Sequence, residues 1–144
     1  VNSEGSSDMY YKGANMLHTL RQLVNNDQKW RQLLRGLNET FYHQTVTTQE
    51  IENYMSEFSG INLTAFFNQY LRDIRIPKLE YSVENNELSY RWNNVVENFE
   101  MPIEIEINQE ALWLYPTADW KKMKINSKQI SIDRDYYINY KQLN

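Results

Sequence analysis

The 144-residue sequence contains no cysteine, and histidine occurs only twice, as His18 and His43. The absence of thiols excludes disulfides, a cysteine nucleophile and thiolate ligands for zinc. No apolar run approaches the roughly 20 residues that a membrane-spanning helix needs. The net charge of -4 argues against a nucleic-acid partner, because such partners usually require a basic face.

The remaining composition is typical of a globular protein, with 41% hydrophobic and 24% charged residues. This length allows one domain, or two small ones that share an interface. Residues 1–8 are small and polar, without the basic and apolar regions of a signal peptide. We interpret them as a loop or a cut end.

Residues 8–74 carry apolar side chains at helical spacing, which predicts about four helices, opened or capped by Asp8, Asp27, Thr47 and Asn62. The first helix is expected to bury a stripe formed by Tyr10, Ala14, Leu17, Leu20 and Val24. Thr47 and Glu50 have the spacing of a capping box. Gly60 supplies a left-handed stop to the third helix, and Pro77 prevents the fourth from continuing.

After Pro77 the apolar period changes from helical spacing to strict alternation. Asn85-Asn86 separates two alternating runs, and residues 103–107 alternate isoleucine with glutamate, as in a strand with one solvated face. Further strands are expected near 111–115, 120–125, 129–133 and 136–140. The prediction is an α+β fold, in which an N-terminal bundle of about four helices precedes a small antiparallel β-sandwich of about seven strands. No Gly/Ser linker joins the two halves, so we expect them to pack rigidly together.

Three motifs resemble those of one enzyme family. The first begins a helix with Tyr10-Tyr11-Lys12-Gly13-Ala14 and continues with Leu17, Leu20 and Arg21. The second is Ser59-Gly60-x-Asn62-Leu63-x-x-Phe66-Phe67-x-Gln69-Tyr70-Leu71, and the third is Ile76-Pro77-x-Leu79. In this order and spacing they resemble the zinc aminopeptidases related to aminopeptidase N, from which Asn62 and Tyr70 are minor departures.

The resemblance implies that residues 1–76 are the C-terminal part of a thermolysin-like peptidase domain and that residues 77–144 are its β-sandwich domain. It also implies that Tyr10 is the catalytic tyrosine, because that position matches the family's tyrosine. Tyrosine side chains ordinarily have a pKa of about 10 and stay protonated at neutral pH. Such a phenol can donate a hydrogen bond to the oxyanion of a tetrahedral intermediate.

The other catalytic elements of that family are missing from the sequence. Neither His18 nor His43 belongs to a His-Glu-x-x-His motif, and the loop Gly-x-Met-Glu-Asn, which binds the substrate's amino terminus, is absent. Both elements lie upstream of the tyrosine in family members. We therefore expect zinc and peptide substrate to bind only in a longer protein, with no metal or cofactor bound by this chain. The chain alone should be inactive, and its exposed apolar surface can drive self-association without the N-terminal part of the catalytic domain.

Other interpretations compete with this one. Tyr10 could simply pack in the core, as most aromatic residues at helical spacing do. A non-catalytic scaffold or peptide-binding module of the same architecture fits the sequence as well. Aromatic residues of the strand half could bind sugars or peptides, although alternation places part of them in the core. Lys121, Lys122 and Lys124 are better explained as protection of a sheet edge than as an anion-binding patch.

Overall fold

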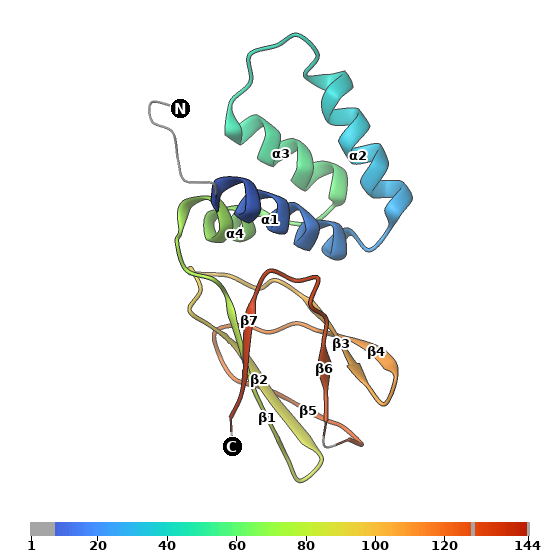
Figure 1. Cartoon of the computed structure of the whole chain (residues 1–144), viewed down its shortest axis with the longest axis vertical. Coiled ribbons are helices and arrows are strands. Elements are labelled where there is room, and N and C mark those ends of the chain that lie inside the picture. Colours follow the sequence, from blue (N-terminus) through green and yellow to red (C-terminus); the bar gives the residue numbers. More distant parts are fainter. Residues whose placement is uncertain (1–7, 128, 144) are drawn as a thin grey trace.

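The computed structural model describes residues 8–127 and 129–143 and has a mixed α+β architecture (Figure 1). The helices come first and the strands second, which confirms the predicted α+β class. The elements in chain order are α1 (Asp8–Val24), α2 (Asp27–Thr40), α3 (Thr48–Ser59), α4 (Thr64–Phe67), the π-helical turn η1 (Asn68–Arg72), β1 (Lys78–Glu84), β2 (Glu87–Asn93), β3 (Ile103–Ile107), β4 (Glu110–Leu114), β5 (Lys121–Lys124), β6 (Ser131–Ile132) and β7 (Asn139–Gln142). Residues 1–7 and the side chain of Asp8 lie outside the described part of the chain, so the Asp8 cap stays a prediction.

The helix boundaries follow local capping chemistry. The capping box is confirmed, since Glu50 N–H donates to the Thr47 hydroxyl and Thr47 N–H donates to the Glu50 carboxylate. Gly60 ends α3 with a φ of 74°, as predicted. The cap of α2 is Asn26 rather than Asp27, because the Asn26 side chain accepts a hydrogen bond from Lys29 N–H at 2.8 Å.

The predicted fourth helix is divided into two short segments. α4 is a single α-helical turn, and η1 continues it as a π-helical turn. Gln69 of η1 is fully buried, and its side chain amide joins the two halves. Gln69 Nε2 donates to the Arg75 carbonyl, and Gln69 Oε1 accepts from Val96 N–H, both at 2.7 Å. These two bonds fix the segment that leads into β1.

The strands form a four-stranded sheet in the order β5-β2-β1-β7 and a three-stranded sheet in the order β4-β3-β6. β1 and β2 are joined by a tight turn at Asn85 and Asn86, whose φ angles are 50° and 62°. β7 pairs with β1 in parallel, so the prediction of a purely antiparallel arrangement is wrong for this strand. The chain reaches β7 from the other sheet and enters beside β1 in the same direction. That the two sheets form the family's β-sandwich domain stays a prediction.

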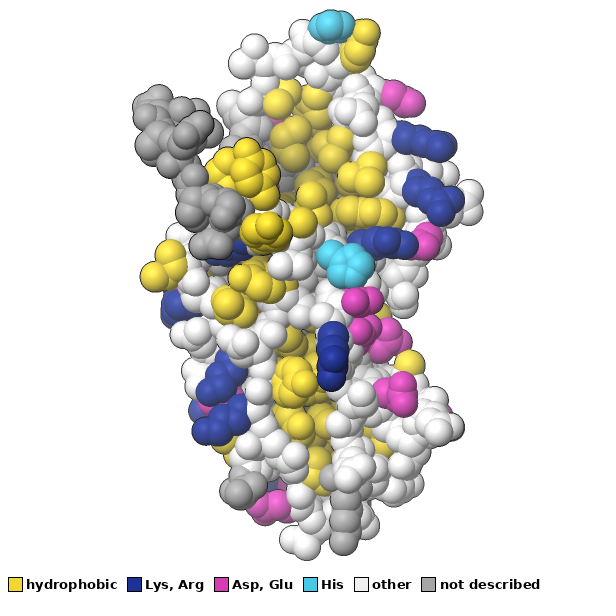
Figure 2. Space-filling view, viewed as in Figure 1, with side chains coloured by type: hydrophobic (Ala, Val, Ile, Leu, Met, Phe, Trp, Pro, Cys, Tyr) yellow, Lys and Arg dark blue, Asp and Glu magenta, His cyan; other side chains and the backbone are white. Residues whose placement is uncertain are grey.

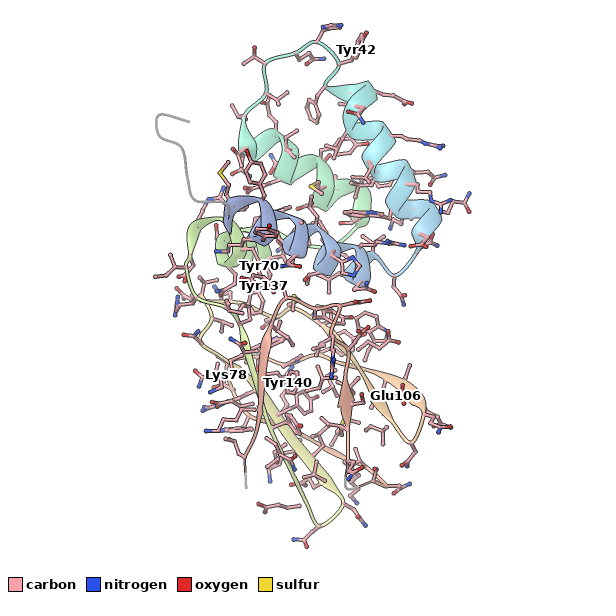
Figure 3. All side chains as sticks on the ribbon, in the orientation of Figure 1. Tyr42, Tyr70, Lys78, Glu106, Tyr137 and Tyr140 are labelled. Carbon is pink, nitrogen blue, oxygen red and sulfur yellow. The ribbon has the colours of Figure 1, made fainter. Side chains whose placement is uncertain are left out.

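The junction between the halves is tightly connected. Figure 1 shows α1 lying between α2 and α3 on one side and the strands on the other. Thr19 of α1 is fully buried, and its hydroxyl accepts a hydrogen bond from Tyr137 N–H at 2.8 Å. The carbonyl of Tyr137 in turn accepts from the Tyr70 hydroxyl at 3.0 Å (Figure 3). Tyr137, in the strand half, is therefore hydrogen-bonded to both α1 and η1.

Candidate functional site

Tyr10 lies in the first turns of α1, and 71% of its surface is exposed. The interpretation of Tyr10 as a core residue is therefore wrong for this chain. The buried stripe expected for the first helix is also partly wrong, because Tyr10 and Leu17 are exposed. The buried residues of α1 are Met16, Thr19, Leu20 and Leu23. α1 has apolar residues on two sides, and its buried side includes Leu20 and Thr19, the residue that binds Tyr137 of the strand half.

The opposite side of α1 is uncovered. Tyr10, Gly13, Ala14 and Leu17 are spaced i, i+3, i+4 and i+7 and share one side of the helix, here called the open face. A Cβ atom added to Gly13 would meet nothing within 4 Å, so there is open space beside this residue. Figure 2 shows hydrophobic side chains gathered over α1 and toward α2 and α3. The Tyr10 phenol is thus displayed on an apolar surface.

Lys12 lies two residues after Tyr10 and points elsewhere. Its ammonium donates a hydrogen bond to the backbone carbonyl of Asp73 at 2.7 Å, joining the start of α1 to the segment that follows η1. The carboxylate of Asp73 accepts from the Arg75 guanidinium at 2.8 and 2.9 Å, and from Arg75 N–H at 2.7 Å. These hydrogen bonds from Arg75, with a smaller contribution from the Lys12 charge, lower the pKa of Asp73 to about 2.

The histidines are not arranged as metal ligands. His18 Nε2 lies 3.4 Å from an Asp135 carboxylate oxygen, and both side chains are half exposed. His43 follows α2 and its ring contacts that of Tyr42. Across residues 8–127 and 129–143, no three His, Cys, Asp or Glu side chains are grouped to hold a metal ion. The donor set of the described chain does not fit zinc.

The other candidate residues have structural explanations. Trp92 is buried in the core, and Trp120 stacks under the Arg91 guanidinium, 4.6 Å from its ring centroid. β5 lies at the edge of its sheet, where its lysines were expected, and their role in edge protection stays a prediction. A groove of about 450 Å³ is lined mainly by α4 and residues 97–102, and Leu23 is its only lining residue from α1. That groove therefore meets α1 at the end opposite Tyr10. In the described residues, no helix is long and apolar enough to cross a membrane.

The comparisons with known proteins concern the fold. No protein-family profile matches the sequence, and no curated protein sequence matches it. The chain is similar in structure to Legionella pneumophila aminopeptidase A, solved in complex with aspartic acid, with a TM-score of 0.67 at 16% identity. The match covers 91% of this chain and 17% of the Legionella chain. The chain therefore has the fold of one section of a much longer aminopeptidase.

Sequence reasoning selected Tyr10 as a candidate, which stays a prediction, and missed the contacts that hold its helix. Lys12 and Asp73 are 61 residues apart, and Thr19 and Tyr137 are 118 residues apart. The one available signal was a threonine placed among the apolar residues of α1. A hydroxyl in that position needs a partner once it is buried.

Proposed function

We propose that this chain is the C-terminal portion of a zinc-dependent aminopeptidase related to aminopeptidase N. Residues 1–76 would complete its peptidase domain, and residues 77–144 would form the β-sandwich domain that follows. The observation that best supports the proposal is the shared fold with a section of an aminopeptidase over 91% of this chain. The order of the three sequence motifs supports it independently.

In this proposal Tyr10 stabilises the transition state. Its exposed phenol would donate a hydrogen bond to the oxyanion that forms when the first peptide bond of a substrate is attacked. One donor of this kind is typically worth ~2.7–4 kcal/mol of transition-state stabilisation. The metal, the general base and the site for the substrate's amino group would belong to a segment outside this chain, because the sequence lacks the family's motifs for them and the described residues include no group of three metal ligands.

The open face supports the same proposal. Apolar side chains such as Leu17 and Leu34 are partly exposed on the helical half, although exposed apolar surface is costly in water. In the longer protein this surface would be covered by the N-terminal part of the peptidase domain. The substrate would then bind beside Tyr10, between the two parts.

The test is a substitution in the longer protein. Tyr10→Phe is expected to lower kcat by about 10²–10³ and to leave zinc content unchanged, because only the hydroxyl is removed. Tyr11→Phe is the matched control, since Tyr11 is equally exposed and occupies the variable position of the motif. A near-normal kcat for Tyr10→Phe would remove Tyr10 from the mechanism. A longer protein without zinc or peptidase activity would instead support the non-catalytic scaffold.

A further inference from the structure

Few side-chain contacts hold the first two turns of α1 in place. Residues 9–15 include no buried side chain, and the first buried residue of α1 is Met16. Among the described residues, Lys12 is the only member of this segment whose side chain bonds to a distant part of the chain. A helix end without packing frays, because its backbone hydrogen bonds open at little cost. The position of Tyr10 therefore depends on whatever restrains these two turns.

The carbonyl that Lys12 binds is itself connected to the strand half by further hydrogen bonds. The Asp73 carbonyl that accepts from Lys12 belongs to a residue whose own carboxylate is bound by Arg75. The Arg75 carbonyl accepts from the buried Gln69 side chain, which also binds Val96 N–H. The start of α1 is thereby connected, through consecutive hydrogen bonds, to the junction with the strands.

Tyr10 and Lys12 project from different sides of α1, so Lys12 can hold the helix while the Tyr10 phenol stays exposed. Residues two positions apart on an α-helix project about 200° from each other. Lys12 reaches toward Asp73, while Tyr10 lies on the open face with 71% of its surface exposed. We infer that Lys12 is a positioning residue for Tyr10, which it orients by binding the Asp73 carbonyl from the far side of the helix.

The first experiment uses the 144-residue chain. Lys12→Met removes the ammonium and keeps the aliphatic stem, so amide hydrogen exchange of residues 12–15 is expected to accelerate about tenfold. Lys12→Arg can still donate to the carbonyl and should restore most of the protection. Lys29→Met is the matched control, because Lys29 makes the same kind of bond, at 2.7 Å to the Ser59 carbonyl, between α2 and the end of α3. Lys29→Met should leave exchange at residues 12–15 unchanged.

The second experiment rests on the proposed function and uses the longer protein. Lys12→Met should lower kcat about tenfold with little change in KM, and it should have little further effect when combined with Tyr10→Phe. A general loss of stability would lower activity equally in both backgrounds. If Tyr10→Phe alone has no effect, the proposed function fails, and the exchange experiment still decides the role of Lys12. Unchanged exchange, or unchanged kcat for Lys12→Met where Tyr10→Phe is impaired, would overturn the inference.

Discussion

The two faces of α1 differ in what covers them. The face around Leu20 is buried and includes the hydrogen bond from Tyr137 N–H of the strand half to Thr19. The open face carries Tyr10 and Leu17, which are 71% and 39% exposed. Both faces are apolar, so composition does not distinguish them. The difference is that side chains of the described chain bury one apolar face of α1 and leave the other exposed.

The largest effect is expected from shortening a side chain on the packed face. Leu20 is fully buried, so Leu20→Ala should lower the free energy of unfolding by about 3 kcal/mol. Leu17→Ala on the open face should change it by less than about 0.5 kcal/mol. Urea unfolding of the isolated chain measures both. Equal effects would mean that the two faces do not differ in solution.

The same pair sharpens the comparison in the longer protein. If the open face meets the rest of a peptidase domain, Leu17→Ala should cost about 2 kcal/mol or more there, because Leu17 would then be buried.

Sedimentation of the isolated chain at rising concentration tests the expected self-association through this face, with Leu17→Glu as the variant that should weaken it. A clean monomer at high concentration would contradict that expectation.

An intermediate effect is expected at the polar contact of the packed face. Thr19→Val keeps the shape of the side chain and leaves Tyr137 N–H without its acceptor, at a cost of about 2 kcal/mol. Thr40→Val, at an exposed position in the last turn of α2, is the control for the loss of a hydroxyl in a helix. If the two substitutions cost the same, the bond between Thr19 and Tyr137 contributes nothing measurable to stability.

The smallest effect concerns the buried phenols near the junction. Burial raises the pKa of Tyr136 to about 12 and also raises the pKa of Tyr70. Tyrosines of the unfolded chain ionise near pH 10, so the unfolded state loses these protons first and stability falls as the pH rises from about 10 to 12. For Tyr136 the loss should be about 1 kcal/mol at pH 11. Urea unfolding at pH 8 and pH 11 measures it, and Tyr136→Phe should show a smaller decrease than the wild type.

Much of the fold could be predicted because its signals are local. Thr47 with Glu50, Gly60 and the Asn85-Asn86 pair act within a few residues of the boundaries that they set. The alternation of isoleucine and glutamate likewise marks β3 without reference to any other strand. Such features depend on neighbouring residues alone, and the structure contains them where the sequence places them.

The misassigned features depend on contacts between distant residues. Apolar residues such as Tyr10 and Met16 lie on different sides of α1, so periodicity alone does not select the side that is buried. The direction of β7 depends on its pairing with β1, about 60 residues earlier. At the candidate site, Tyr10 was identified through a motif, whereas its support by Lys12 depends on a carbonyl 61 residues away.

The hydrogen bond between Thr19 and Tyr137 also bears on the order in which the protein can fold during synthesis. α1 is synthesised before the strand half, and the N–H group that binds Thr19 is made 118 residues later. At roughly 5–20 residues per second, that interval lasts about 6–24 seconds. Through this period the hydroxyl of Thr19 and the apolar side chains around it lack their final partners. The helical half is therefore exposed to premature association until Tyr137 has been made.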